Sequence, residues 1–254
     1  MTRPPERSPA IVLTVSNHGE SDKIVTFYCP AFGKLTGIAK GANRSKKRFV
    51  NKLELFSLLE IHFTPGDRSS LVRIDQADLV SAFPNLRAHY DRYNNASLLC
   101  ELLLHWTTES DGDEKIFQLI KWALQRLDAG DPQHRTIILF QIKLFDLLGY
   151  RPHLANCIDC GCHDDSGAPY RFSSSRGGLV CSRCNHESVA AHIPLSLGTA
   201  RLLSKAQTMP HEKITRLQFS PSSTHEAITF MKRYNSDLLQ REINSWSALS
   251  KTSC

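Results

Sequence analysis

Two Cys-x-x-Cys pairs constrain the fold of this chain more than any other feature of its sequence. Cys157-x-x-Cys160 is followed, after twenty residues, by Cys181-x-x-Cys184, and this spacing is typical of a four-thiolate zinc site. Two residues between thiols allow a tight turn to present both sulfurs to one cation. Four thiolates fill the zinc tetrahedron and leave no position for water. We therefore expect one structural Zn²⁺ bound by Cys157, Cys160, Cys181 and Cys184.

A redox dithiol and two accidental pairs of core cysteines are the alternatives to a metal site. A redox motif needs only one pair and usually lies beside a βαβ unit, which this segment lacks. The zinc-deaminase signature, Pro-Cys-x-x-Cys after His-x-Glu, is also absent. The identity of one ligand stays open. Cys162, His163 and His186 lie close enough in the chain for one of them to replace one of the four cysteines.

The positive charge of the chain is concentrated in its first fifth. Residues 1–52 contain ten Lys or Arg and three acidic residues, a balance of 10 − 3 = +7, whereas the remainder contains twenty-one basic and twenty-two acidic residues, a balance of −1. Such an asymmetry predicts a polyanion partner for the N-terminal part. The cysteines outside the two pairs are scattered singly, which suits a reducing cytosol.

The sequence predicts a cytoplasmic protein with no membrane partner. Its N-terminal residues have no apolar core of the kind that follows the charges of a secretory signal. No window approaches the ~20 apolar residues that a membrane span requires.

Residues 10–80 have the pattern of short strands separated by turns. Apolar and β-branched runs occupy 10–15, 23–29, 35–40, 56–64 and 71–79, with Gly, Pro, Asn and Asp between them. Five such strands fit a small barrel or sandwich. An OB-type barrel would bind oligonucleotides on its strand face and loops. An SH3-like barrel without a ligand remains open, because the number of strands does not distinguish the two.

A basic loop follows the third expected strand. Its five cations fall within nine positions and are Lys40, Arg44, Lys46, Lys47 and Arg48. Lys and Arg contact phosphates without reading base sequence, and the aromatic residues Tyr28, Phe32 and Phe49 are candidates for stacking on unpaired bases. A solvated loop beside core aromatics is the alternative. The barrel and the charge asymmetry together favour nucleic acid.

From residue 86 the apolar residues recur at helical spacing. We predict a long amphipathic helix from Leu86 to Trp106, a second over 114–127, and a third over 133–148 that is apolar nearly all round and therefore buried. After the metal segment we predict a helix over 195–206 with Ser196 as its N-cap. Ser223-x-x-Glu226 has the form of a capping box that opens the last helix.

These patterns predict an α+β chain of two domains. The first is an N-terminal five-stranded β-barrel over residues 1–80, of the OB or the SH3-like type. The second is an α-helical domain over 81–254, into which a four-cysteine zinc-binding segment, residues 150–190, is inserted.

Four stretches match, in order, the pattern of one known family. They are Gly19-Glu20-Ser21-Asp22-Lys23-Ile24-Val25; Gly33-Lys34 through Ala39-Lys40-Gly41-Ala42; Leu148-Gly149-Tyr150-Arg151-Pro152, which leads to the first cysteine pair; and Arg176-Gly177-Gly178-Leu179-Val180-Cys181. With these stretches the chain resembles the RecO family of bacterial recombination mediators over nearly its whole length.

The resemblance implies that the barrel over residues 1–80 is an OB fold, and that a zinc-finger segment is inserted in the helical domain that follows it. It also implies a function in RecF-pathway DNA repair and recombination, without enzyme activity. It implies binding of single- and double-stranded DNA, annealing of single strands, and partnership with RecR and with the C-terminal tail of the single-stranded DNA-binding protein, SSB. RecA, an indirect partner, would then load onto SSB-coated strands at the nucleoid. The DNA-contact set implied by the resemblance is Lys34, Lys40, Arg44, Lys46, Lys47 and Arg48.

An SSB tail, which is acidic and apolar, would require an apolar groove rimmed by cations. The helical part offers Arg126, Arg135 and Lys143 for such a rim. Ordinary surface positions are the alternative for each of these three residues.

Two other classes of function are possible. A zinc-dependent enzyme would need an open metal position or a carboxylate pair, but the acidic clusters at 111–114 and 164–165 fall in loop-like segments without a matching partner. A zinc-ribbon DNA-binding or scaffold protein without mediator activity would use Arg171, Arg176 and Arg183. Nearby acidic residues offset those charges, so we keep the zinc ribbon as the alternative function.

Overall fold

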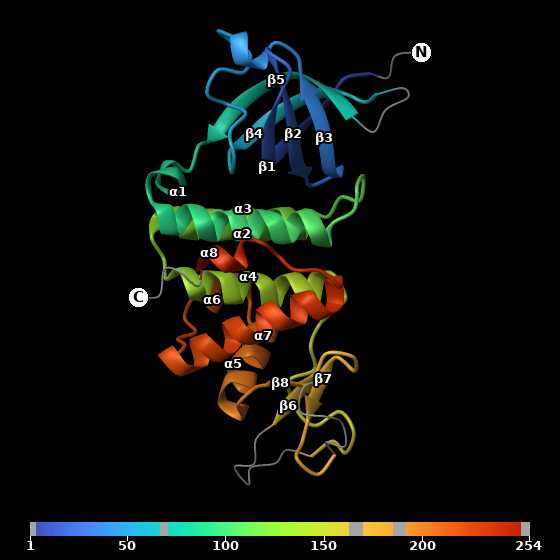
Figure 1. Ribbon diagram of the computed structural model, residues 1–254, viewed down its shortest axis with the longest axis vertical. Coiled ribbons are helices and arrows are strands. Elements are labelled where there is room, and N and C mark those ends of the chain that lie inside the picture. Colours follow the sequence, from blue (N-terminus) through green and yellow to red (C-terminus); the bar gives the residue numbers. More distant parts are fainter. Residues whose placement is uncertain (1–3, 67–70, 163–169, 185–191, 250–254) are drawn as a thin grey trace. The chain divides into compact units, whose positions relative to one another are not determined.

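Five strands close into a barrel in the computed structural model of the protein (Figure 1), which describes residues 4–66, 71–162, 170–184 and 192–249. The strands are β1 Glu6–His18, β2 Asp22–Cys29, β3 Gly33–Ala39, β4 Leu58–Thr64 and β5 Leu71–Ser81. The closed order is β1-β2-β3-β5-β4, with β1 paired to β4 and with one parallel pair, β3 with β5. This mixed five-stranded barrel confirms the predicted OB-type fold.

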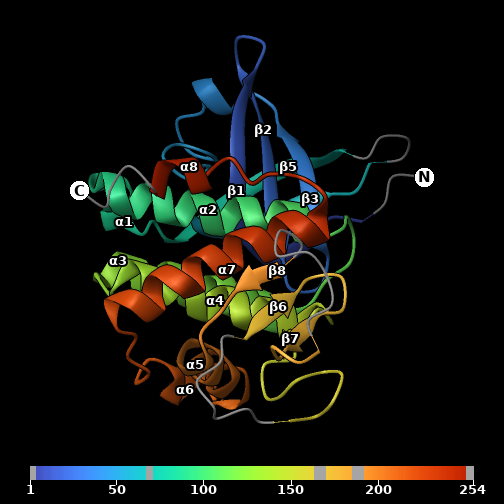
Figure 2. The same ribbon diagram turned by 60° about the horizontal axis from the view of Figure 1, so that its bottom comes forward.

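Alternation along the strands determines which side chains fill the barrel. In β3 every second residue from Gly33 to Ala39 is buried, as expected when one face of a strand points inward. Gly37 lies at a crowded position of this strand, since an added Cβ would lie 2.8 Å from side-chain atoms of Val72 and Ile74. The β1–β2 hairpin projects from the barrel at the top of Figure 2.

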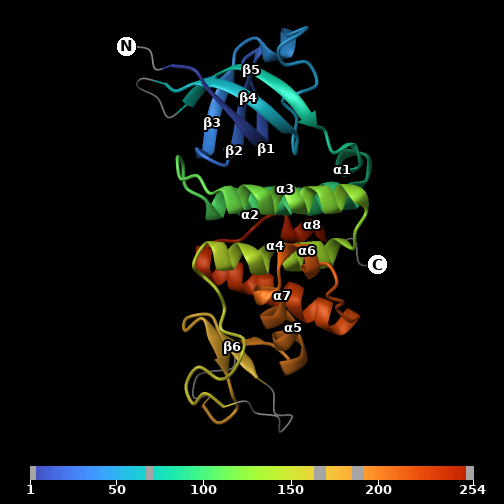
Figure 3. The ribbon, with the colours of Figure 1, turned by 180° about the vertical axis from the view of Figure 1, so that it is seen from behind.

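The α-helices that follow the barrel directly in sequence belong to the same compact unit, which comprises residues 1–130 and 247–254. They are α1 Pro84–Ala88, α2 Tyr90–Trp106 and α3 Glu114–Ala129. In Figure 3, α2 and α3 lie across one end of the barrel. A single long helix from Leu86 is wrong, because His89 has an extended backbone with φ −122° and ψ 118°. The Asp128 carboxylate accepts hydrogen bonds from the N–H groups of Asn85 and Leu86, at 2.8 and 3.2 Å, and so stabilises α1 separately.

The second compact unit comprises residues 131–246. Its elements are α4 Gln133–Leu147, β6 Arg171–Ser173, β7 Gly178–Val180, β8 His192–Pro194, α5 Leu197–Thr208, α6 His211–Ile214 and α7 Pro221–Leu239, and α8 Trp246–Leu249 follows at the end of the described chain. Helix α4 contacts both α5 and α7, which confirms that it is buried by neighbours. In the α4–α7 contact, the buried Asn235 amide donates to Oε1 of Gln141 at 2.6 Å.

One helix cap in this unit confirms its prediction and one corrects it. Ser196 caps α5 as expected. The predicted capping box is wrong, because α7 begins earlier, after Ser220, whose Oγ accepts from the N–H of Ser223 at 3.1 Å. Glu226 instead accepts from the N–H and the Oγ of Ser196, at 3.1 and 2.6 Å. This carboxylate therefore joins the start of α5 to α7.

An aromatic cluster joins the small sheet of this unit to its helices. The sheet is antiparallel, in the order β7-β6-β8. Phe172 on β6 meets Phe230 and Tyr234 of α7 edge-on, with ring centroids 4.9 and 5.0 Å apart. Tyr234 also meets Phe145 of α4 at 5.0 Å. The sheet is thus fixed to the helices, and β7 leads directly into the second cysteine pair. None of the described helices is long and apolar enough to cross a membrane.

Candidate metal centre and nucleic-acid interface

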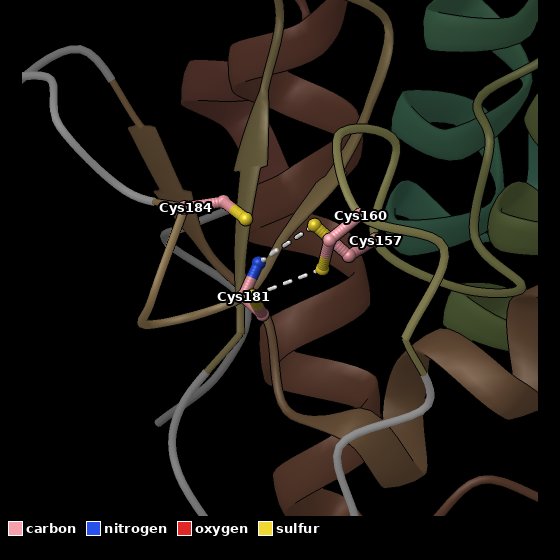
Figure 4. A group of neighbouring side chains, drawn as sticks. All are labelled: Cys157, Cys160, Cys181 and Cys184. Atoms are coloured by element: carbon pink, nitrogen blue, oxygen red, sulfur yellow. Dashed lines mark hydrogen bonds between the residues drawn. The ribbon is translucent and has the colours of Figure 1, made fainter.

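Two backbone turns bring the four predicted zinc ligands together (Figure 4). The Cys157 carbonyl accepts from the N–H of Gly161 at 2.9 Å, and the Cys181 carbonyl accepts from the N–H of Cys184 at 3.1 Å. All four Sγ atoms lie within 4.8 Å of one another, and those of Cys160 and Cys181 are 3.7 Å apart. Sulfurs ~2.3 Å from a central zinc are about 3.8 Å apart in a tetrahedron. The cluster therefore has the size needed to hold a metal ion.

Backbone hydrogen bonds attach the first turn to β7. The N–H of Ile158 donates to the Leu179 carbonyl at 2.9 Å, and the N–H of Leu179 donates to the His153 carbonyl at 3.0 Å. Gly178 permits this approach, because an added Cβ would lie only 2.2 Å from Cγ2 of Ile158. Gly177 has a φ of +67°, which favours glycine. The two glycines of the Arg176–Cys181 motif are therefore requirements of local geometry.

The four thiols of the cluster differ in how readily they ionise, because their surroundings lower the pKa of Cys157 and Cys181 and raise that of Cys160 and Cys184. Cys157 and Cys181 are buried, whereas Cys160 is exposed. The N–H of Cys181 donates to Sγ of Cys157 at 3.4 Å, one of the dashed lines in Figure 4. Burial opposes ionisation of Cys181, but hydrogen bonds from the backbone and thiol of Cys184 and from neighbouring thiols lower its pKa to about 6. Since the thiolate is the form that binds metal, this environment suits a metal centre.

A fifth thiol, that of Cys162, lies beside the cluster. Its Sγ is 3.2 Å from Sγ of Cys160. The interaction with the Cys160 thiol, together with burial, raises the pKa of Cys162 to about 11. The group of four thiols that could hold a metal ion does not include Cys162. The two other possible substitutes, His163 and His186, lie outside the described residues.

The arginines of the metal segment are partly engaged by carboxylates. Nη1 of Arg176 is 2.9 Å from both carboxylate oxygens of Asp159, and Arg171 is half-buried on β6. The pairing of Arg176 agrees with the expectation that acidic neighbours offset the positive charge here.

The basic loop between β3 and β4 begins at the short 3-10 helix η1, Ala42–Arg44. Asp22 fixes its start, because Oδ1 accepts from the N–H of Gly41 at 2.8 Å. This bond and one from the Ser21 hydroxyl lower the pKa of the Asp22 carboxyl. Gly41 has a φ of +70°, a conformation that favours glycine. The matching stretches around Asp22 and Gly41 are therefore joined by this side-chain hydrogen bond in addition to the β2–β3 pairing.

The structure brings five of the six predicted DNA-contact residues together on this loop with exposed side chains, namely Lys40, Arg44, Lys46, Lys47 and Arg48. Arg44 forms an ion pair with Glu20 at 3.0 Å, and the guanidinium of Arg48 lies 5.0 Å from the centroid of the Phe49 ring. An ion pair between two exposed groups contributes at most about 1 kcal/mol, so Arg44 can exchange it for a phosphate contact.

Lys34 has a different environment from the other five. Its Nζ donates to the carbonyls of Leu104 and Thr107, at 2.7 and 2.6 Å, at the end of α2, where carbonyls have no partner within the helix. The preceding Gly33 has a φ of +64°, and an added Cβ would lie 2.4 Å from the Asp111 carbonyl oxygen. The Gly33-Lys34 pair therefore attaches β3 to α2 and to the α2–α3 connection.

The aromatic residues predicted to stack on bases are occupied elsewhere. Tyr28 and Phe49 are buried, and the Tyr28 hydroxyl accepts from the N–H of Asp113 at 3.2 Å. The stacking prediction is wrong for both, because these rings fill the barrel and its contact with the α2–α3 connection. Phe32 packs edge-on against Phe63 at 5.2 Å. Exposed aromatic rings of the described chain that we did not single out are those of Tyr90, Tyr93 and Tyr150.

Of the cations considered for a peptide groove, Arg126 lies on α3, whereas Arg135 and Lys143 both lie on α4. Lys143 is buried, and its Nζ donates to the carbonyls of Gln207 and Met209 at 2.7 and 2.8 Å, at the end of α5. It is therefore unavailable for the rim of an open groove. Arg135 is 3.7 Å from Asp131, and Arg126 lies in the last turn of α3.

The acidic residues weighed for catalysis have a structural explanation where they are described. Asp113 is the N-cap of α3, and its carboxylate accepts from two backbone N–H groups. Residues 164 and 165 lie outside the described part of the chain.

Comparisons with known proteins cover both compact units. Residues 1–83 match the family model "Recombination protein O N terminal", and residues 87–247 match "Recombination protein O C terminal". Curated relatives named "DNA repair protein RecO" include one from Syntrophus aciditrophicus, 32% identical over 251 residues, with 98% of this chain and 97% of the relative covered. One from Syntrophobacter fumaroxidans is 36% identical over 213 residues and covers 84% of each chain.

A third relative, from Desulfosudis oleivorans, is 30% identical over 251 residues, with 96% of each chain covered. The matches extend through the barrel, the helices and the cysteine cluster, and the family is not one of enzymes. The chain belongs to the RecO family of DNA repair and recombination proteins.

Proposed function

We propose that this protein is a DNA-binding recombination mediator of the RecF pathway. It anneals single strands and helps RecA load onto SSB-coated single-stranded DNA, together with RecR and the SSB C-terminal tail. It acts in the cytoplasm at the nucleoid and also binds double-stranded DNA. The observation that supports this most directly is the exposed basic loop at residues 40–48 on an OB-type barrel. Such cations neutralise phosphates without reading sequence, which suits a protein that acts on any single strand.

The cations assigned to DNA in this proposal are Lys40, Arg44, Lys46, Lys47 and Arg48. Lys34 is assigned to the attachment of β3 to α2 because of its two carbonyl partners. We keep the division into an OB-fold domain, residues 1–80, and a helical domain, 81–254, with an inserted segment at 150–190.

The proposal includes one Zn²⁺ with a structural role. Its ligands are Cys157, Cys160, Cys181 and Cys184, whose separations fit a tetrahedral ion. Within 153–184, the residues that the structure describes form only three-residue strands. Metal binding would therefore supply folding free energy that such short elements lack.

Annealing of complementary strands precoated with SSB tests the function. The intact, zinc-loaded protein is compared with a variant in which Arg44, Lys46, Lys47 and Arg48 are replaced by Gln. The salt dependence of single-strand binding is the slope of log Kobs against log salt concentration. Loss of four phosphate contacts should reduce the magnitude of this slope by about 2.8. The matched control replaces Arg171 and Arg183 in the metal segment by Gln, since Arg176 is held by Asp159.

Annealing that is present in the intact protein and the control, and lost in a folded loop variant, supports a mediator that works through its barrel. Loss of DNA binding in the control, with the loop variant unaffected, would favour a zinc-ribbon DNA-binding protein. An intact, zinc-loaded protein that binds DNA and does not anneal would refute the mediator function.

A further inference from the structure

We propose that Tyr90 and Tyr93 form a base-stacking subsite for unpaired nucleobases, and this inference rests on the proposed binding of single-stranded DNA. Tyr90 is 70% exposed and Tyr93 39% exposed. Aromatic rings on which successive bases stack are a general feature of single-strand binding, and their stacking tolerates any sequence. With Tyr28 and Phe49 buried, this pair supplies the exposed rings that a single-strand site requires.

Helix geometry places the two rings on one face. Tyr90 and Tyr93 are three residues apart in the first turns of α2, so their side chains are neighbours on the helix surface. The ring of Tyr93 meets that of Phe56 edge-on, with centroids 5.3 Å apart, and Phe56 is fully buried. Tyr93 is therefore held by a fixed neighbour while part of its surface remains open, as a stacking platform requires.

The loop that contains the basic residues also ends at this surface. Arg87 of α1 donates to the Leu55 carbonyl at 3.2 and 2.6 Å and to Oγ of Ser57 at 2.7 Å, which fixes the end of the loop to α1. In Figures 1 and 3 the chain descends from η1 along the barrel toward α1. Arg48 and Phe56 are eight residues apart, and so at most ~29 Å apart along the chain. A strand at the upper end of the roughly 4–16 nucleotides bound by an OB fold is therefore long enough to reach both.

Charge around the tyrosines is compatible with a nucleic acid. The guanidinium of Arg87 lies within electrostatic range of Tyr93 and Glu54. The carboxylate of Glu54 is paired with Nζ of Lys23 at 3.0 Å. A strand whose phosphates contact residues 44–48 would thus have a cation beside Tyr93 as well. Because bases in a duplex are already stacked on each other, the subsite is specific for single strands.

The experiment separates stacking from phosphate contact. Binding of a thirty-residue oligothymidylate and of an abasic strand of equal length is measured by fluorescence anisotropy at one salt concentration. The proteins are the intact chain, Tyr90→Ala, Tyr93→Ala, the double alanine variant and the double phenylalanine variant. Val80→Ala is the control, because Val80 is an exposed apolar residue of the same unit, at 62%, without a ring.

Each alanine substitution should weaken binding of the oligothymidylate roughly 5- to 150-fold. Binding of the abasic strand should be unchanged, and the phenylalanine variant should bind both strands as the intact protein does. Tyr93→Ala removes a ring that packs on Phe56 and can therefore affect folding, so Tyr90→Ala provides a second test of stacking. The urea midpoint of each variant is measured alongside.

An alanine pair that binds oligothymidylate as tightly as the intact protein would overturn the subsite while leaving the proposed function in place. Equal losses on the thymidylate and abasic strands would also overturn it. If the intact protein binds neither strand, the proposed function itself fails, and the two failures are therefore distinguishable.

Discussion

Replacing Lys34 by Met should destabilise the protein without changing how it contacts phosphates. Methionine keeps most of the apolar stem and removes the ammonium that donates to the carbonyls of Leu104 and Thr107. Those carbonyls end α2, where the partial negative charge of the helix also favours a cation. The change therefore tests whether Lys34 joins β3 to α2 or contacts DNA.

The expected loss of stability follows from the two hydrogen bonds. A hydrogen bond to a charged group contributes roughly 1.5–3 kcal/mol. Lys34 is half-buried, and burial lowers the pKa of its ammonium, so desolvation offsets part of this gain. Water can also hydrogen-bond to the carbonyls of Leu104 and Thr107 once the ammonium is removed, which reduces the loss of stability. We therefore expect a decrease of about 2 kcal/mol in the free energy of unfolding, or about 4–8 °C in Tm for a chain of this size.

Urea unfolding and the salt dependence of single-strand binding are measured on the same samples. Lys34→Met should lower the urea midpoint and leave the salt slope unchanged. The matched control is Lys47→Met on the basic loop, which should reduce the slope by about 0.7 for a single strand. Its unfolding free energy should stay within about 0.5 kcal/mol of the intact protein. A reduced slope and an unchanged midpoint for Lys34→Met would refute the assignment.

Three further predictions concern the metal centre, the barrel joint and the start of α5. Cys157→Ser should abolish stoichiometric zinc, measured by metal analysis, and lower the unfolding temperature, whereas Cys162→Ser should retain one ion per chain. Zinc at full occupancy in Cys157→Ser would show that another group replaces Cys157 as the ligand. Gly33→Ala should lower the free energy of unfolding in urea by at least about 2 kcal/mol, because Gly33 has a φ of +64° and a backbone carbonyl oxygen would lie 2.4 Å from the new Cβ. An unchanged urea midpoint would contradict this close approach. Glu226→Gln should cost about 1 kcal/mol near neutral pH, because Ser196 lowers the pKa of this carboxyl although burial opposes the shift. A lowered pKa means that the stabilisation is present above the unfolded value and disappears as pH falls through the folded pKa, so the Tm difference between Glu226→Gln and the intact protein should vanish in acid; a difference that persists there would exclude the ionised carboxylate as its source.

The cysteine cluster and the barrel strands could be predicted because local spacing determines both. Two residues between thiols define a turn whatever surrounds it, and each of the five predicted runs overlaps a strand of the barrel. Strand order could not be read in the same way. The parallel β3–β5 pair depends on a crossing of the chain that no local pattern contains.

The aromatic residues show where spacing is insufficient. Phe49 follows the basic loop directly in sequence and Tyr28 lies on a predicted strand of the barrel, and both were candidates for stacking. Tyr28 instead ends against the α2–α3 connection, through a hydrogen bond from Asp113 that is eighty-five residues away. Tyr90 and Tyr93 fall within the amphipathic helix predicted from Leu86 to Trp106, and the helical period did not show that both are exposed. An alternation or helical period identifies a face, but only tertiary contacts show whether that face is covered.

The same limitation decides which DNA-binding variant is informative. By charge alone, Lys34 and Lys47 are equivalent members of one basic set, and a variant that neutralises all six cations would be the natural choice. Such a variant would also remove the two hydrogen bonds that attach β3 to α2, so a loss of binding could come from a weakened barrel joint. The fourfold change at Arg44, Lys46, Lys47 and Arg48 leaves that joint intact. A loss of annealing in the fourfold variant would therefore report on phosphate contact, whereas the same loss in the sixfold variant would not.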